Sequence, residues 1–143
     1  MTEKHSLVLI PGLLCTADLW RDQVAALSDI AAITIADHTQ DDNMPDIARR
    51  ILESAPPRFA LAGLSMGGYI ALEIMRQAPE RVTHLAIMDA RAVGDTPEDR
   101  QRRIDFIRLV EQGSAFKGVT RSLLPTLIHP SRLEDDALTS RIF

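Results

Sequence analysis

The sequence predicts an α/β protein with a mostly parallel sheet and helices on both faces of that sheet. Short apolar runs alternate with helical patterns from residue 6 to residue 88. Such alternation is typical of βαβ units, whose crossovers are right-handed. The runs are continuous rather than alternating in polarity, as in strands that are buried on both faces. The connections between them are short, which favours neighbouring elements in one compact layer structure.

Length and composition set the bounds for the function. The chain has 143 residues, which is enough for one domain, and 45% of them are hydrophobic and 25% charged. A net charge of −4 without a basic tract argues against a nucleic-acid partner. No apolar run approaches the roughly 18 residues that a membrane span needs. The single cysteine, Cys15, rules out an intrachain disulfide and favours a reducing compartment, so we expect a cytoplasmic protein.

The chain up to Asp89 alternates between strand and helix patterns. Pro11 ends the first apolar run, Pro56 stops the second helix and Pro79 closes the third, because proline interrupts regular structure. Thr16 is a candidate cap for the first helix. In order, we expect strands over 6–10, 30–36, 59–62 and 82–88, and helices over 18–27, 46–55 and 66–78.

Helical patterns alone follow after Asp89. Thr96-Pro97-Glu98-Asp99 is a strong helix start, and Gly113 ends that helix. A second helical piece over about 114–128 is expected to break near Pro125, and Ser131-Arg132-Leu133-Glu134 fits a capping box for a third. We therefore expect a core over 1–94 and a helical segment over 95–143 within the same structural domain.

A G-x-S-x-G motif, made by Gly63, Ser65 and Gly67, lies between the third strand and the helix that follows it. A serine on such a sharp strand-to-helix turn is held in a strained backbone geometry with its hydroxyl exposed. Glycines flank it because backbone meets backbone there. The free N–H groups at the start of the helix face any negative charge that forms beside the serine oxygen.

These residues resemble the nucleophile elbow of the α/β-hydrolase superfamily. Gly63-Leu64-Ser65-Met66-Gly67-Gly68 matches the elbow, Leu7 to Leu14 looks like the first core strand with its oxyanion loop, and the helix over 18–27 also fits. The helices over 95–143 resemble the family's cap. The resemblance runs along the whole chain but stops before the part of the family that supplies the acid and the histidine. We therefore expect an incomplete fold that lacks further strands.

The resemblance implies a serine hydrolase that acts on a small carboxylic ester, lactone or thioester. Ser65 would be the nucleophile, and Gly63 and Gly67 would shape its turn. The backbone N–H groups of Leu13 and Met66 would form the oxyanion hole. This chemistry needs no metal and no organic cofactor.

The general base is harder to assign. The family order is serine, then acid, then histidine, and the histidines after Ser65 are His84 and His129. His84 begins a strand at the end away from Ser65, so Asp89 with His129 is the one complete triad that the sequence offers. That triad requires a cap residue to reach the core. The alternative is a non-catalytic binding module, or an inactive fragment that lacks acid and histidine.

Two further expectations concern surfaces. Without additional strands, the strand over 82–88 would be an uncovered edge, so we expect self-association. The loop over 37–43 carries Asp37, Asp41 and Asp42, but their spacing and missing partners do not fit a metal site. We expect this loop, including His38, to be solvated.

Overall fold

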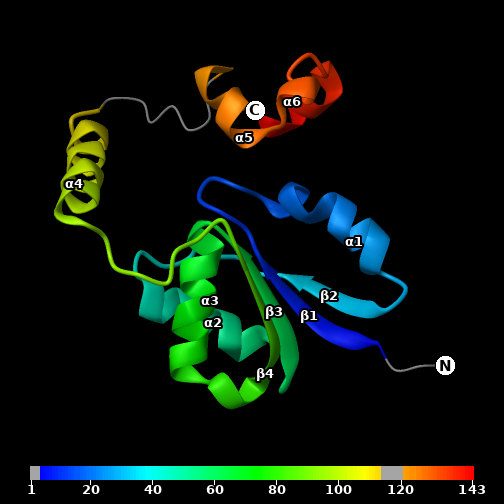
Figure 1. The fold of residues 1–143 in the computed structure, drawn as a ribbon. Helices are drawn as coiled ribbons and strands as arrows, with labels where there is room; N and C mark the ends of the chain where they lie inside the picture. Colours follow the sequence, from blue (N-terminus) through cyan, green and yellow to red (C-terminus); the bar gives the residue numbers. More distant parts are fainter. Residues whose placement is uncertain (1–3, 114–120) are drawn as a thin grey trace. The chain divides into compact units, whose positions relative to one another are not determined.

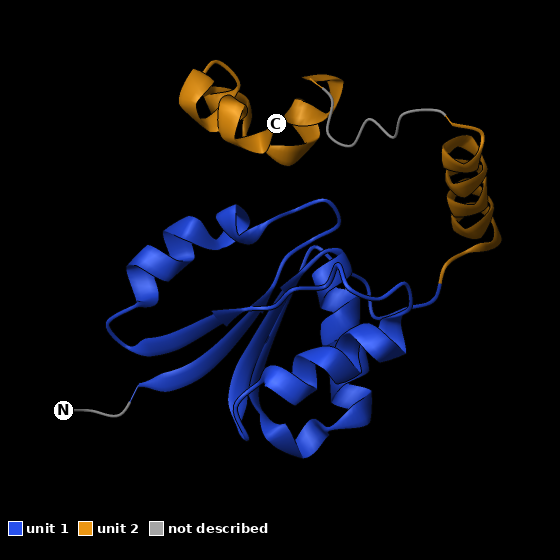
Figure 2. Cartoon of the chain, turned by 180° about the vertical axis from the view of Figure 1, so that it is seen from behind, with its two compact units in different colours: residues 1–94 blue, residues 95–143 orange. Residues whose placement is uncertain are grey.

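The computed structural model describes residues 4–113 and 121–143 of the chain. They form two compact units, residues 1–94 and residues 95–143, which Figure 2 shows in different colours. The predicted helical piece over 114–128 therefore lies partly outside the described residues.

The first unit is built on a four-stranded sheet (Figure 1). The strands are β1 (His5–Ile10), β2 (Ala31–Ile35), β3 (Phe59–Leu64) and β4 (Val82–Met88), in the order β2-β1-β3-β4. All three pairings are parallel, which confirms the predicted fold class. Because the strands are parallel, all their carboxyl ends lie at one edge of the sheet, where ligands bind in such folds.

Helices cover both faces of this sheet, as the sequence predicted, but they do so unequally. On one face, α2 (Met44–Ser54) and α3 (Met66–Gln77) pack a large buried cluster against β1 and β3. On the other face, the turn before α1 (Arg21–Leu27) supplies Trp20 to a small cluster. The larger cluster contains Val8, Ile10, Ala36, Ile47, Ala48, Ile51, Phe59, Leu61, Ile70, Ala71 and Ile74.

The ends of two helices differ from the prediction. The helix expected over 18–27 is divided into a 3₁₀ turn, Ala17–Trp20, and then α1. The Thr16 hydroxyl accepts a hydrogen bond from the Asp18 N–H at 3.2 Å, and this tight start favours 3₁₀ geometry. Helix α2 starts two residues earlier than expected, because the Asn43 side chain caps it by accepting from the Asp46 N–H at 3.0 Å.

Arg81 fastens the start of β4 to the end of α2. Its guanidinium donates to the carbonyls of Leu52 at 2.9 Å, Ala55 at 2.9 Å and Pro56 at 2.8 Å. The last carbonyls of a helix have no partner within the helix, so Arg81 satisfies them and complements the negative end of the α2 dipole. The guanidinium also lies over the Phe59 ring, 5.6 Å from its centroid.

The regular elements in the described residues of the second unit are helices joined by turns. Helix α4 (Pro97–Glu111) has the predicted capping box, in which Thr96 and Asp99 each bond the other's backbone N–H. The shorter helices α5 (Leu124–Leu127) and α6 (Asp136–Ile142) follow. None of the helices in the described residues is long and apolar enough to cross a bilayer.

Of the two local predictions for this unit, the one at Ser131 is wrong. The helical segment changes from a 3₁₀ turn, Arg121–Leu123, to α5 next to Pro125, which lies in the first turn of α5, where its missing N–H costs nothing. The capping box expected at Ser131 is absent, since Ser131 lies inside a 3₁₀ turn, Pro130–Arg132. Asp135 caps α6 instead, by accepting from the Leu138 N–H at 3.0 Å.

Candidate active site

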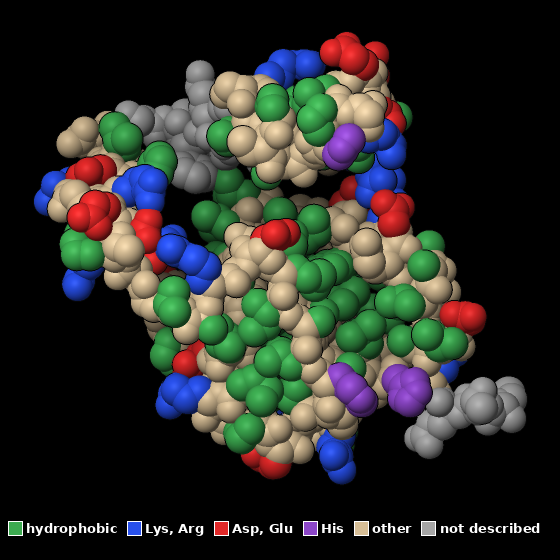
Figure 3. Space-filling model, in the orientation of Figure 1, with side chains coloured by type: hydrophobic (Ala, Val, Ile, Leu, Met, Phe, Trp, Pro, Cys, Tyr) green, Lys and Arg blue, Asp and Glu red, His purple; other side chains and the backbone are tan. Residues whose placement is uncertain are grey.

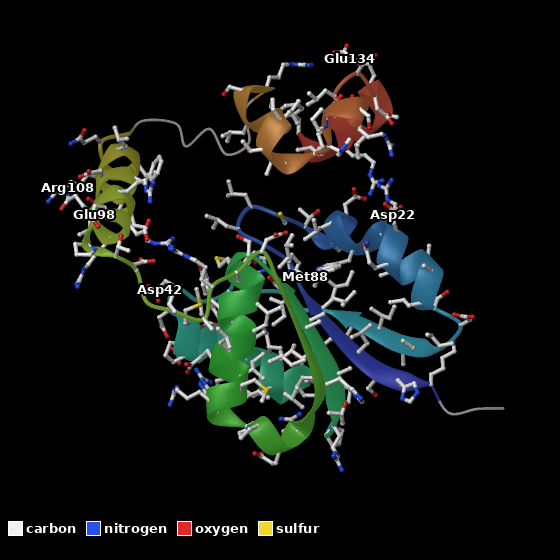
Figure 4. The ribbon with its side chains drawn as sticks, viewed as in Figure 1. Asp22, Asp42, Met88, Glu98, Arg108 and Glu134 are labelled. Carbon is white, nitrogen blue, oxygen red and sulfur yellow. The ribbon has the colours of Figure 1, made fainter. Side chains whose placement is uncertain are left out.

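Ser65 lies between β3 and α3 in a backbone conformation that side chains rarely adopt, with φ 51° and ψ −115°. The residue is exposed at the carboxyl end of β3. Its N–H donates to the carbonyl of Met88 at 2.8 Å, and Figure 4 labels Met88 where β4 ends. The predicted strand–turn–helix is therefore present, and the neighbouring strand holds the serine's backbone in place.

The two glycines of the motif are required by close backbone packing. A Cβ on Gly63 would overlap the carbonyl of Gly67, and a Cβ on Gly67 would overlap the carbonyl of Ile10. Both separations would be under 3.0 Å, which real Cβ atoms essentially never show. The Ser65 turn, which we define as residues 63–67, is thus pressed against the end of β1.

The loop after β1 lies beside Ser65. A Cβ on Gly12 would be 3.6 Å from the Ser65 Cβ and 3.4 Å from the Leu64 carbonyl oxygen, both ordinary contacts. The Gly12 carbonyl accepts from the Cys15 N–H at 3.1 Å, which closes a tight turn. The N–H of Leu13 lies inside this turn and is not used by its hydrogen bond.

Met66 is the first residue of α3. The N–H groups in the first turn of a helix have no partner within that helix, and they carry the positive end of its dipole. Two short segments with backbone N–H groups, one at Leu13 and one at Met66, therefore flank the serine. Such an arrangement is chemically suited to stabilise a negative oxygen next to Ser65.

Asp89 follows Met88 directly and is the third residue at this edge with a left-handed backbone, at φ 49°. Its side chain is exposed. The next residue, Ala90, packs on the first turn of α3, since its Cβ is 2.6 Å from where a Cβ on Gly68 would lie. The structure thus brings the backbone of Asp89 close to the Ser65 turn.

His129 belongs to the second unit and already has a local role. Its Nδ1 accepts from the Ser131 N–H at 3.3 Å and lies 2.9 Å from the Ser131 Oγ. The ring therefore caps the turn Pro130–Arg132. His129 and Ser65 thus belong to different units.

The other histidines lie elsewhere in the first unit. His5 begins β1 and His84 lies near the start of β4, at the edge of the sheet opposite Ser65. His38 follows β2 and is 8% exposed, so the prediction that it is solvated was wrong. Within the described residues of the first unit, 4–94, no hydrogen bond joins any of these three histidines to Ser65. Sequence reasoning missed the burial of His38, because the loop around it is polar.

The acidic loop after β2 is organised by its own hydrogen bonds. Asp37 accepts from the Thr39 N–H at 2.9 Å and from its hydroxyl at 2.7 Å, and these bonds hold the pKa of Asp37 below its usual range. Asp41 pairs with Arg50. Among the described residues there is no group of three or more potential metal ligands.

Two surface grooves of the described residues are lined by residues other than Ser65. One, of about 350 Å³, is lined by Asp37, Gln40, Arg50 and their neighbours. Another, of about 500 Å³, runs along α4 beside Phe106 and Leu109. Neither groove has Ser65 in its lining, and backbone geometry at Ser65 is a better guide to chemistry than groove size.

Comparisons with known proteins bear on the fold of the chain. No protein-family model matches the chain. A pimeloyl-[acyl-carrier protein] methyl ester esterase from Hamiltonella defensa is 37% identical over 59 residues, covering 41% of this chain and 23% of the relative. The Vibrio campbellii esterase with the same description is 29% identical over 87 residues, covering 55% of this chain and 34% of the relative.

Solved structures match a larger part of the chain. A hydrolase from Pseudomonas aeruginosa superposes with a TM-score of 0.64 at 20% identity, covering 87% of this chain and 54% of that one. An extracellular α/β-hydrolase from a Paenibacillus species gives a TM-score of 0.63 at 20% identity, covering 96% and 65%. The chain thus spans about a quarter to a third of these curated relatives and about half to two thirds of these solved structures. The sheet order, the crossovers and these similarities show that the chain has the fold of the α/β-hydrolase superfamily.

Proposed function

We propose that the protein is a serine hydrolase in which Ser65 attacks the carbonyl carbon of a carboxylic ester, lactone or thioester. The Ser65 oxygen forms a bond to that carbon while its proton passes to a base. The bond from the carbon to the alcohol oxygen or thiol sulfur then breaks, and the leaving group takes that proton from the base. Water releases the acid from the acyl-serine and restores Ser65. The observation that carries this proposal is the strained, exposed Ser65 between β3 and α3.

The backbone N–H groups of Leu13 and Met66 are proposed to bind the oxygen that becomes negative in the tetrahedral intermediate. The closeness of Gly12 to Ser65 supports this assignment for the loop after β1. The position of Met66 at the start of α3 supports it for the elbow. Losing one such donor typically costs about 2.7–4 kcal/mol in the reaction barrier.

For the acid and the base, Asp89 and His129 are the candidates within this sequence. Asp89 is supported by its place directly after the strand that bonds the Ser65 N–H. His129 has weaker support, because its ring caps a turn in the other unit.

The substrate class follows from the proposed chemistry and from the relatives. The two curated relatives are named as methyl ester esterases of an acyl chain on a carrier protein. We therefore propose a small acyl ester as substrate, with no cofactor in the reaction. A cytoplasmic location, inferred from the single Cys15, belongs to the same proposal.

A serine substitution tests the proposal. Ester hydrolysis is measured for the parent protein, for Ser65→Ala and for Ser54→Ala as a matched control on the surface of α2. We expect Ser65→Ala to abolish hydrolysis and Ser54→Ala to retain it. Equal hydrolysis by the parent and by Ser65→Ala would refute the assignment of Ser65.

A non-catalytic binding module is the second candidate. It is favoured because, within the described residues of the first unit, none of His5, His38 and His84 bonds Ser65. One experiment distinguishes the two candidates. A binding module would bind an ester without releasing acid, and its affinity would be equal in the parent protein and in Ser65→Ala.

We also propose that the chain self-associates through the edge of β4. This strand is the last in the sheet order, and residues 83–86 within it are exposed. Its residues 82–88 carry no lysine, proline or acid, the usual features that protect edges from pairing. Sedimentation of the parent and of Leu85→Lys tests this: we expect a dimer or larger species that Leu85→Lys dissociates, and a monomeric parent would refute it.

A further inference from the structure

Two adjacent leucines are exposed in the loop beside Ser65. Leu13 is 58% exposed and Leu14 is 57% exposed. The surrounding segment, residues 11–16, contains no charged side chain. Single exposed leucines are common on protein surfaces and need no explanation. Two adjacent exposed leucines on a short loop beside the candidate nucleophile are less common.

The backbone of this loop is strained at Leu14. Its φ is 60°, in the left-handed region that glycine or asparagine adopts at low cost. A leucine there costs about 1–2 kcal/mol. Buried packing does not offset this cost, because more than half of the side chain is exposed. Strain that the fold does not need is typical of ligand-binding positions.

The loop's location supplies the third observation. The turn that contains Leu13 and Leu14 is closed by the bond between Gly12 and Cys15, and Gly12 lies against Ser65. Hydrophobic side chains also gather over the strands on the more thinly covered face of the first unit (Figure 3). An ester carbonyl placed at Ser65 would therefore extend its chain over an apolar surface.

We propose that Leu13 and Leu14 form a platform that binds the straight hydrocarbon chain of the ester and so sets its preferred length. This inference rests on the proposed function of Ser65. The strained turn orients both leucines while it leaves the Leu13 N–H outside the turn's own hydrogen bond. Leu14 is thus a specificity-determining residue, and it takes no part in bond breaking.

Binding to an inactive protein tests the platform separately from catalysis. Methyl butanoate, methyl hexanoate and methyl octanoate are titrated into Ser65→Ala by NMR, so that no ester is consumed. A fully buried CH₂ contributes about 0.8 kcal/mol. On an open platform about half of each CH₂ is buried, which corresponds to roughly a twofold gain in affinity per CH₂. We therefore expect affinity to rise about fourfold at each step of two carbons.

Leu14→Asn in the same background removes the hydrocarbon but keeps a residue that tolerates positive φ. We expect the dependence on chain length to disappear in this variant and in Leu14→Gly, which serves if the first variant folds poorly. Ile30→Asn, at a 56% exposed isoleucine just before β2, is the matched control and should retain it. Two results would overturn the platform. One is a chain-length dependence that is the same with and without the Leu14 side chain, and the other is no chain-length dependence in Ser65→Ala itself.

The two proposals fail in different ways. A length preference that requires Leu14, combined with a Ser65 that never hydrolyses ester, would keep the platform and refute the hydrolase. Ester hydrolysis that depends on Ser65 but shows no length preference would keep the hydrolase and refute the platform.

Discussion

Ser65 and His129 occupy turns that are built in opposite ways. The Ser65 turn is strained, and close backbone contacts from β1 together with a hydrogen bond from β4 hold it in that state. The His129 turn is relaxed, and the ring of His129 satisfies backbone groups of its own segment. Strain enforced from several sides indicates a position prepared for chemistry, whereas a capping side chain already has a structural use.

The largest expected effect is on stability, and it distinguishes Gly67, which lies within the Ser65 turn, from Gly12, which lies beside it. Gly67→Ala forces a Cβ into the Ile10 carbonyl, so we expect a loss above about 4 kcal/mol in the free energy of unfolding or no folding at all. Gly12→Ala makes ordinary contacts and should change stability by about 0.5 kcal/mol or less.

Urea denaturation of the two variants measures this difference. A Gly67→Ala protein as stable as Gly12→Ala would mean that the Ser65 turn is not held by β1. The Ser65 turn would then be no more constrained than the His129 turn.

Arg81→Met should have the next largest effect, although it lies far from the Ser65 turn along the sheet. It leaves the last carbonyls of α2 without their partner, and unpaired buried polar groups cost about 1–3 kcal/mol. Arg58→Met, at an exposed arginine nearby, is the control for lost charge. Thermal unfolding of both checks this, and equal melting temperatures would show that Arg81 does not fasten β4 to α2.

Substitutions at Asp89 and His129 sharpen the comparison directly. Asp89→Asn keeps a residue that tolerates positive φ, so we expect unchanged stability and, if Asp89 is the acid, a loss of hydrolysis. His129→Ala removes a cap and should cost about 1 kcal/mol in the free energy of unfolding. Loss of hydrolysis in His129→Ala, without loss of folding, would instead make His129 the base.

The smallest effect concerns α3 itself. Arg76 and Gln77 lower the pKa of Glu73 to about 2, below its usual value of 4.5. The charged form is therefore stabilising above pH 4.5, and this contribution disappears as the pH falls from 4.5 toward 2. We expect melting curves of the parent and of Glu73→Gln to differ near neutral pH and to converge in acid. A constant difference across this range would contradict the assignment.

Much of the first unit was predictable because local signals agreed. Pro11 ends the first apolar run, and Pro56 and Pro79 end the second and third helices. These ends indicated the order of the strands and crossovers. The turn at Ser65 was predictable because only glycines fit where backbones touch.

Other features depend on contacts that no local pattern records. Leu14 adopts a positive φ that leucine normally avoids, and His38 is buried although its loop is polar. The cap of α6 is Asp135, while Ser131 carries an equally good local signal. The polar loop gives no sign that His38 is buried, and Ser131 and Asp135 offer two local capping signals of similar strength.

Covalent labelling of Ser65 tests the central claim most directly. The chain is treated with a fluorophosphonate that reacts with activated serines, and the intact mass and the modified peptide are determined. The account predicts a single adduct at Ser65 that is absent from Ser65→Ala. A well-folded protein that gains no adduct, or gains it at another serine such as Ser131, would contradict the claim that this turn presents a nucleophile.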